Sequence, residues 1–256
     1  MYHRIIVKIG TSVITNAKGG LDELTLKRLV EETAQLRKKN TEVVIITSGA
    51  VGTGRALVTL KEGSDSVVQK QVFAAVGQVK LMSLYAEYFA KEGIVCAQVL
   101  ATKEDFRDKQ HYQHMKDCIE NLLRNNVVPI VNENDVVAVA ELVFTDNDEL
   151  AGLLASQLNV NAIFLLTGID GVMEGDWKKG NAKVIPEIRL SNISSFEKHI
   201  TEEKSDFGRG GMRTKFEIAK KLAQDGITTY IANGKVPGIL AGLNSGLSIG
   251  TRFLPN

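Results

Sequence analysis

Two clusters of Asp, Asn and Glu side chains, each close behind an apolar run, are the groups in this sequence best suited to hold a ligand. The first cluster, 132–135, reads N-E-N-D and follows V-V-P-I-V; the second, 146–148, reads D-N-D and follows a run that ends at Phe144. Polar groups crowded at the end of a buried strand cost free energy unless they are partnered. Because open α/β sheets bind ligands at the carboxyl ends of their strands, we predict that both clusters belong to a ligand site.

Each cluster also has a purely structural interpretation. Asp146 together with Glu149 matches a capping box in front of an apolar helical segment, so helix capping alone would explain Asp146. Asn147 and Asp148 fall within the first turn of that helix and are less well explained by capping. The cluster 132–135 consists of residue types that form turns, although four polar residues in succession favour a site.

Two segments combine a lysine with glycine and would suit a phosphate group. V-K-I-G-T-S (7–12) ends a strand-like run at Lys8 and breaks at Gly10, which exposes backbone N–H groups beside a point charge. The densest glycine cluster, F-G-R-G-G-M-R-T-K (207–215), leads into a helix that carries Lys215, so free N–H groups, a helix dipole and a cation coincide. The structural alternatives are an edge lysine beside an ordinary glycine turn and a flexible loop.

Two further glycine turns follow strand-like runs. T-S-G-A-V-G-T-G (47–54) would place N–H groups at a helix N-terminus, which suits a carboxylate or phosphate, and a tight turn is an equal alternative. Its glycines lack the G-x-G-x-x-G spacing, so a nicotinamide-binding oxidoreductase is not supported. L-L-T-G-I-D-G (165–171) would form part of a nucleotide pocket or a simple β-turn.

Short apolar runs alternate with longer amphipathic segments along the chain. The runs are rich in Val and Ile without polar alternation, as is typical of parallel strands covered on both faces, and the longer segments repeat Leu and Ala at helical spacing. Strands are predicted at 4–9, 42–47, 94–100, 127–131, 162–167 and 227–232, and helices at 24–39, 67–91, 108–124, 147–158 and 212–224. This predicts the α/β class: a three-layer α/β/α sandwich with a mostly parallel central sheet, as a single domain over 1–256.

Composition excludes several classes of protein. The 256 residues carry a net charge of +1, which argues against a basic surface for nucleic acid or an anionic membrane. No apolar run approaches the roughly 18 residues of a membrane span, and the apolar stretch near the N-terminus is shorter than expected of a signal peptide. Cys96 and Cys118 are expected to be reduced thiols of a cytoplasmic protein. His111 and His114 have no third ligand nearby, so no metal site is predicted.

Taken in order, these segments resemble the amino acid kinase family. The motifs that carry the resemblance are V-K-I-G-T-S near the start, T-S-G-A-V with G-R at 54–55, A-A-V-G-Q at 74–78, V-P-I-V-N-E-N-D, D-N-D at 146–148 and G-G-M-R-T-K. The resemblance spans Val7 to about Gly250. K-I-G-T-S combined with N-E-N-D separates the chain from the aspartokinase, uridylate kinase and acetylglutamate kinase branches. It looks like the branch that phosphorylates the side-chain carboxylate of glutamate.

The resemblance implies transfer of the ATP γ-phosphoryl group to L-glutamate, which gives γ-glutamyl phosphate in the first step of proline biosynthesis. Lys8 and Lys215 would stabilise the transferred group, and Asp148 would orient both lysines. The implied glutamate-binding residues are Ser48, Gly49, Asn132, Asp135 and Asn147. The implied ATP-binding residues are Lys8, Gly10, Thr11, Thr167, Gly168, Arg209, Gly210, Gly211, Met212, Arg213, Thr214 and Lys215.

The resemblance also implies partners. Mg²⁺ would arrive with the ATP, proline would act as a feedback inhibitor, and the chain would form a homo-oligomer without nucleic acid or membrane partners. Many relatives continue into a PUA domain, so the chain is expected to be the catalytic domain alone. Relatives commonly read T-D-x-D-G where this chain has Thr167 and then Gly168. That departure motivates one alternative, a non-catalytic amino-acid sensor. A sister kinase with another carboxylate substrate is a second alternative.

Overall fold

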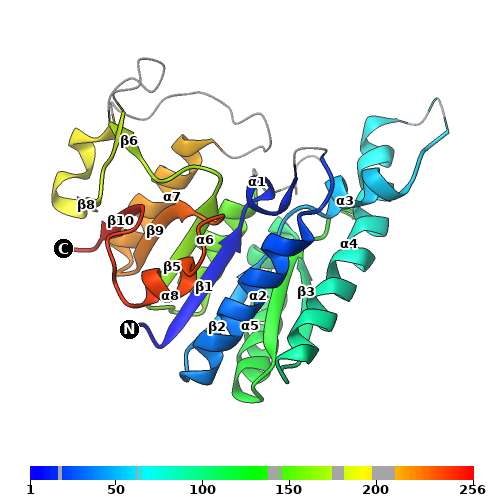
Figure 1. Cartoon of the computed structure of the whole chain (residues 1–256), viewed down its shortest axis with the longest axis horizontal. Coiled ribbons are helices and arrows are strands. Elements are labelled where there is room, and N and C mark those ends of the chain that lie inside the picture. The colour runs from blue at the N-terminus through cyan, green and yellow to red at the C-terminus, as the bar shows by residue number, and fades with distance from the viewer. Residues whose placement is uncertain are drawn as a thin grey trace.

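The computed structural model describes residues 1–16, 19–61, 63, 65–137, 144, 146–174, 182–197 and 211–256. Strands and helices alternate along these residues (Figure 1). The strands are β1 (Arg4–Ile9), β2 (Glu42–Ile46), β3 (Cys96–Ala101), β4 (Val128–Glu133), β5 (Ala162–Thr167), β6 (Met173–Glu174), β7 (Lys183–Val184), β8 (Glu187–Arg189), β9 (Thr228–Asn233) and β10 (Thr251–Leu254). The helices are α1 (Thr11–Ile14), α2 (Glu23–Lys38), α3 (Ala50–Leu57), α4 (Ser66–Lys91), α5 (Lys109–Arg124), α6 (Asn147–Gln157), α7 (Met212–Gln224) and α8 (Ile239–Asn244), with short 3-10 helices at Lys103–Phe106 and Leu190–Ser195.

The main sheet is mostly parallel, as predicted. Its strand order is β3-β4-β2-β1-β5-β9-β10-β8, and β6 pairs with β7 in a separate hairpin. Every pairing in the main sheet is parallel except β9 with β10. The six predicted strands correspond to β1 through β5 and β9. The strands β4, β2, β1 and β5 are neighbours and run parallel. Their carboxyl ends, which lead into the motifs, therefore lie side by side at the same end of the sheet.

Both faces of the sheet are buried because its strands carry apolar side chains in either direction. In β1, Ile5 and Val7 pack into one core cluster, whereas Ile6, on the opposite face, packs into another. Apolar residues of α2, α4 and α8 cover the first face, and those of α5, α6 and α7 cover the second. Figure 1 shows the sheet between these two helix layers. The three-layer prediction is confirmed, while the expectation of one domain over 1–256 stays a prediction.

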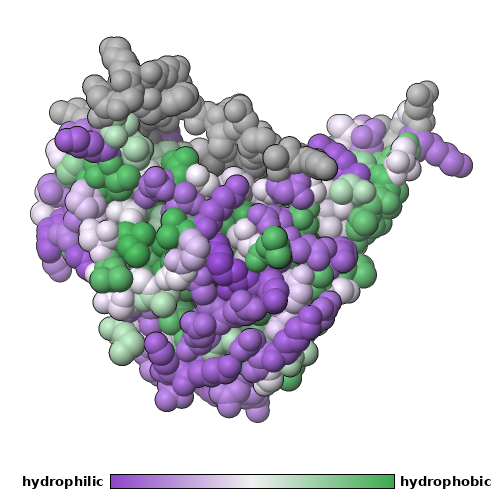
Figure 2. Space-filling model, viewed as in Figure 1, coloured by the Kyte–Doolittle hydropathy of each residue, from purple (hydrophilic) through white to green (hydrophobic). Residues whose placement is uncertain are grey.

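Local signals set the helix boundaries. Asp22 accepts a hydrogen bond from the Thr25 N–H at the start of α2, and Asp108 does the same for α5. Asn40 and Asn126 adopt positive φ angles of 62° and 61° just after α2 and α5, a conformation that asparagine tolerates at a helix end. In Figure 2 the surface over α2 is mainly hydrophilic, and apolar groups gather at the edge formed by α4. No described helix has the length and apolar character needed to cross a bilayer.

Helices α3 and α4 touch backbone to backbone at two glycines. A Cβ added to Gly77 would lie 1.8 Å from the carbonyl oxygen of Ala50, and one added to Gly54 would lie 1.9 Å from that of Phe73. Only glycine permits this approach. The contact matters because α3 begins just after the 47–49 turn and α4 carries A-A-V-G-Q, so it fixes two functional motifs against each other.

We expect Gly77→Ala to lower the free energy of unfolding by about 1–3 kcal/mol, because the steric clash outweighs the better helix propensity of alanine. Gly52→Ala, in α3, is the matched control, since its Cβ would meet nothing nearer than the Gly19 carbonyl oxygen at 3.8 Å. That variant should be neutral or more stable by up to about 1 kcal/mol. Urea denaturation of both variants measures the difference. Equal stabilities would show that the helix contact is not tight.

Candidate active site

Three strongly buried charged side chains form one group around Asp148. Its Oδ1 lies 2.6 Å from Lys8 Nζ and its Oδ2 lies 2.9 Å from Lys215 Nζ. The Asp148 side chain is fully buried, and those of Lys8 and Lys215 are 6% and 8% exposed. Lys8 comes from β1, Asp148 from the first turn of α6 and Lys215 from the first turn of α7. The structure therefore brings together the three residues predicted to be catalytic.

Electrostatics hold Asp148 in its ionised form. Burial alone would raise the pKa of its carboxyl group, but the charges and hydrogen bonds of Lys8 and Lys215 outweigh this and lower the pKa. One carboxylate facing two ammonium groups leaves a net positive charge on these three buried side chains. Such a site suits an anionic ligand or an anionic transition state.

The glycine at the end of β1 lets this group form. The Gly10 N–H donates to the Leu166 carbonyl oxygen at 3.0 Å, and a Cβ on Gly10 would lie 2.9 Å from that same oxygen. A side chain here would push β1 away from β5. Thr11 begins α1 directly after this close approach. Gly10 and Thr11 therefore follow Lys8 closely in the sequence.

Asn147 connects the buried charges to the turn after β2. Its Nδ2 lies 2.7 Å from the Thr47 carbonyl oxygen, 3.1 Å from Ser48 Oγ and 2.9 Å from Asn132 Oδ1. Gly49 follows with φ 93°, a left-handed conformation that favours glycine and starts α3. Four of the five predicted glutamate-binding residues, Ser48, Gly49, Asn132 and Asn147, are thereby assembled around one amide group.

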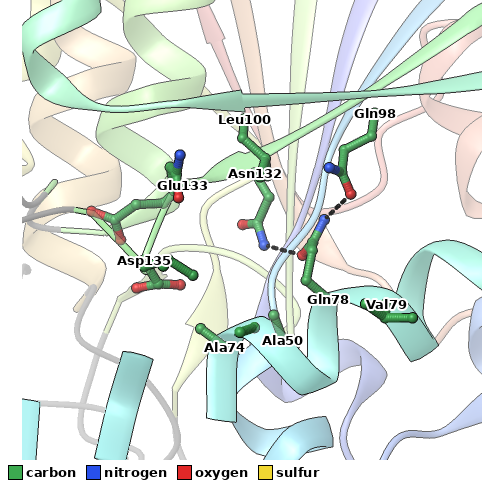
Figure 3. A pocket seen from close by; sticks show the side chains of 12 residues that line it. Ala50, Ala74, Gln78, Val79, Gln98, Leu100, Asn132, Glu133 and Asp135 are labelled. Atoms are coloured by element: carbon green, nitrogen blue, oxygen red, sulfur yellow. Dashed lines mark hydrogen bonds between the residues drawn. The ribbon is translucent and has the colours of Figure 1, made fainter. Parts of the chain in front are cut away.

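A pocket of about 250 Å³ opens beside this amide group, between β3, β4 and the helices α3 and α4 (Figure 3). Asn132 Nδ2 donates to Gln78 Oε1 at 2.9 Å, and Gln78 Nε2 donates to Gln98 Oε1 at 3.0 Å. The first acidic cluster lines the pocket, including Asp135, whose carboxylate forms an ion pair with Lys70 of α4. The fifth predicted glutamate-binding residue thus lies at the same pocket as Asn132.

The capping interpretation of Asp146 is confirmed. Its Oδ1 accepts hydrogen bonds from the backbone N–H groups of Asp148 and Glu149 at 2.9 and 3.1 Å. The Glu149 carboxylate instead pairs with Lys103 at 2.6 Å. Burial, and next the charge of Asp148, raise the pKa of the Asp146 carboxyl group. Because it accepts these backbone hydrogen bonds, Asp146 orients the helix turn that carries Asn147 and Asp148.

The predicted nucleotide segments lie on the other side of Lys8. Thr167 ends β5, and its carbonyl oxygen accepts from the Gly234 N–H at 2.9 Å. A Cβ on Gly168 would lie 3.2 Å from Ser12 Oγ. Gly211 caps α7, and the helix opens with Met212, Arg213, Thr214 and Lys215. Arg209 and Gly210 lie outside the described residues.

Some residues that line the pocket, or that pair with a lining residue, had no signal of their own in the sequence. Lys70 and Gln98 sit in a helix and a strand without glycine turns, and Gln78 entered only as part of A-A-V-G-Q. Their roles in the pocket depend on α4 crossing in front of β3 and β4. Within the described ranges, no group of three or more His, Cys, Asp or Glu side chains is arranged to hold a metal ion.

Comparison with known proteins gives a consistent result. The amino acid kinase family matches residues 3–233. A glutamate 5-kinase of Chlorobaculum tepidum is 49% identical over 99% of this chain and 70% of its own length, and one of Bacteroides thetaiotaomicron is 45% identical over 100% and 71%. Carbamate kinase from Giardia lamblia bound to AMP-PNP shares the fold, with a TM-score of 0.71, 20% identity and 99% of each chain covered.

UMP kinase from Bacillus anthracis also shares the fold, with a TM-score of 0.68, 14% identity, and coverage of 100% of this chain and 97% of its own. The fold, the buried lysine–aspartate–lysine group and the ordered motifs define a small-molecule kinase of the α/β class. The chain belongs to the amino acid kinase family, and within it the sequence is similar to glutamate 5-kinases.

Asp148→Asn should destabilise the protein by about 3–5 kcal/mol at neutral pH, because it removes the carboxylate that contacts both buried ammonium groups. Glu187→Gln is the matched control: Glu187 also contacts two cations, Arg252 at 2.6 Å and Arg189 at 2.8 Å, but is 31% exposed. We expect a loss of at most about 1 kcal/mol there. Denaturant unfolding of both variants gives the comparison.

The effect of Asp148 should also depend on pH. Because folding lowers the pKa of this carboxyl group, its contribution is complete above the unfolded-state pKa of about 3.9 and is lost as the pH falls through the folded-state pKa. The stability gap between the wild-type protein and Asp148→Asn should shrink below about pH 4. A gap that stays constant down to the acid transition would contradict the ion-pair account.

Proposed function

We propose that this chain transfers the γ-phosphoryl group of ATP to the γ-carboxylate of L-glutamate, giving γ-glutamyl phosphate and ADP as the first step of proline biosynthesis. The observation that carries the proposal is the pair of buried lysines around Asp148, beside a polar pocket. Similarity to glutamate 5-kinases over the whole chain supports the choice of substrates.

The chemistry requires positioning and charge. An oxygen of the γ-carboxylate attacks the γ-phosphorus, and the bond from that phosphorus to the β–γ bridging oxygen breaks, so ADP leaves with the electron pair. The carboxylate is already ionised, and no general base is needed. Because phosphoryl transfer depends mainly on alignment and on stabilising the equatorial oxygens, Lys8 and Lys215 are suited to the task. Asp148 holds both ammonium groups in place.

The remaining predicted residues divide between the two substrates. Ser48, Gly49, Asn132, Asp135 and Asn147 would bind glutamate, since they meet around one pocket and one amide group. Gly10, Thr11, Thr167, Gly168 and the segment 209–215 would bind ATP from the other side of Lys8. Mg²⁺ would arrive with the nucleotide, because this ion is commonly held by substrate phosphates and few protein groups. Proline feedback and a homo-oligomer stay predictions.

An acyl-phosphate trap tests the function directly. With ATP, Mg²⁺ and hydroxylamine, the protein should form γ-glutamyl hydroxamate and release ADP in a glutamate-dependent manner. Aspartate and carbamate serve as competing acceptors. Turnover with one of these acceptors but not glutamate would identify a sister kinase, and glutamate binding by calorimetry without turnover would identify a sensor. Either result would refute the proposal.

Substitutions should separate transfer from binding. Lys215→Ala should lower kcat about 10²- to 10³-fold, the loss typical of one preorganised donor to a developing anion, and Lys8→Ala should act likewise. Neither should raise the KM for glutamate to a similar extent. Asp135→Ala should mainly raise that KM, by about 10- to 100-fold. Steady-state kinetics checks the split, and an unaltered KM in Asp135→Ala would show that glutamate binds elsewhere.

A further inference from the structure

Lys70, which forms an ion pair with Asp135 at the edge of the pocket, has no role in the function proposed above. Lys70 and Asp135 pair with each other, and their side chains are 27% and 12% exposed. Lys70 lies one helical turn before Ala74, which lines the pocket, and its ammonium group contacts Asp135, which also lines the pocket. Asp135 faces the same place from the segment after β4 (Figure 3).

The ion pair of Lys70 and Asp135 lies where it could contact the far end of a ligand that reaches Lys8. Asn132 lines the pocket together with Asp135, and Asn132 also receives the hydrogen bond of Asn147, the residue before Asp148. A ligand that places a carboxylate near Lys8 at one end would therefore extend along Asn132 towards Asp135 and Lys70. At that far end it would meet one negative and one positive side chain.

An amino-acid head group carries the complementary charges. We propose that Lys70 and Asp135 form a zwitterion clamp: Asp135 receives the α-ammonium group of the substrate and Lys70 receives its α-carboxylate. The inference rests on the proposed function and extends it, because it assigns the α-carboxylate to a residue outside the predicted site.

Charge balance makes the exchange favourable. Without substrate, each side chain neutralises the other, so neither leaves an unpaired charge at the half-buried rim. When the amino acid binds, one partly exposed ion pair of small net worth is replaced by two charge-assisted contacts to the substrate. A ligand that lacks either charge breaks the pair and leaves one member without a partner. The pair would thereby select for α-amino acids over simple carboxylic acids and amines.

Substrate analogues allow each charge to be tested separately. 4-Aminobutyrate is glutamate without the α-carboxylate, and glutarate is glutamate without the α-amino group; both retain the carboxylate that is phosphorylated. Lys70→Met should lower kcat/KM for glutamate by about 10- to 100-fold, mainly through KM, while lowering kcat/KM for 4-aminobutyrate much less. Asp135→Asn should show the reciprocal pattern, with glutarate as the less affected substrate.

Two controls make the result specific. Lys91→Met removes a lysine from the same helix, at a site where Lys91 pairs with Glu87 at 2.6 Å and is 59% exposed, and it should leave the preference for glutamate intact. Lys70→Arg keeps the positive charge and should retain most of the preference for glutamate over 4-aminobutyrate. If Lys70→Met does not fold, Lys70→Gln compared with Lys70→Arg provides the same test.

Two outcomes would overturn the clamp while leaving the proposed function intact. If Lys70→Met lowered the KM for glutamate, Lys70 would be a competitor that occupies Asp135 and not a ligand for the substrate. If it changed kcat/KM for glutamate and 4-aminobutyrate equally, its role would be structural. Failure of the wild-type protein to form γ-glutamyl hydroxamate would refute the proposed function itself, so the two failures are distinguishable.

Discussion

The ion pairs of Asp148 are the interaction on which the site depends. A carboxylate with no exposure loses its hydration, and the loss is offset only because two ammonium groups lie within 2.9 Å of its oxygens. Those three side chains come from β1, α6 and α7, which lie far apart in the sequence. The pairing therefore fixes the start of both helices relative to the central strand, and it aligns the charges before any substrate arrives.

The sheet order makes this convergence possible. β1 lies between β2 and β5, so the residues after all three strands meet at one edge. Gly10 lets β1 approach β5 closely, and Gly54 and Gly77 let α3 and α4 cross with their backbones in contact. These three glycines thus permit close packing of the backbone. They bring polar side chains of the surrounding turns within hydrogen-bonding distance, as in the contacts of Asn147.

Much of the fold could be predicted from the sequence, because a strand buried on both faces must be apolar throughout. The predicted strands 4–9 and 162–167 coincide with β1 and β5, and the predicted helix 212–224 coincides with α7. Short elements such as α1, β8 and β10 carry too few residues to show a period. The pairing of both Lys8 and Lys215 with Asp148 was accessible only through the family resemblance, since periodicity says nothing about contacts between distant segments. Lys70 was missed because a lysine on a long helix is usually solvated.

The group around Asp148 and the ion pair of Lys70 with Asp135 differ in their degree of burial. Separating Asp148 from its lysines would cost much free energy, because the side chains are almost completely buried and carry charge. A fixed arrangement of charges is what preorganised electrostatic stabilisation requires. Lys70 and Asp135 are partly exposed. Separating this ion pair therefore costs less free energy, and the charged groups of a bound amino acid can replace each partner. The fold thus places Lys8 and Lys215 in a buried group that suits the proposed transfer. It places Lys70 in a partly exposed ion pair that suits the proposed recognition of the substrate.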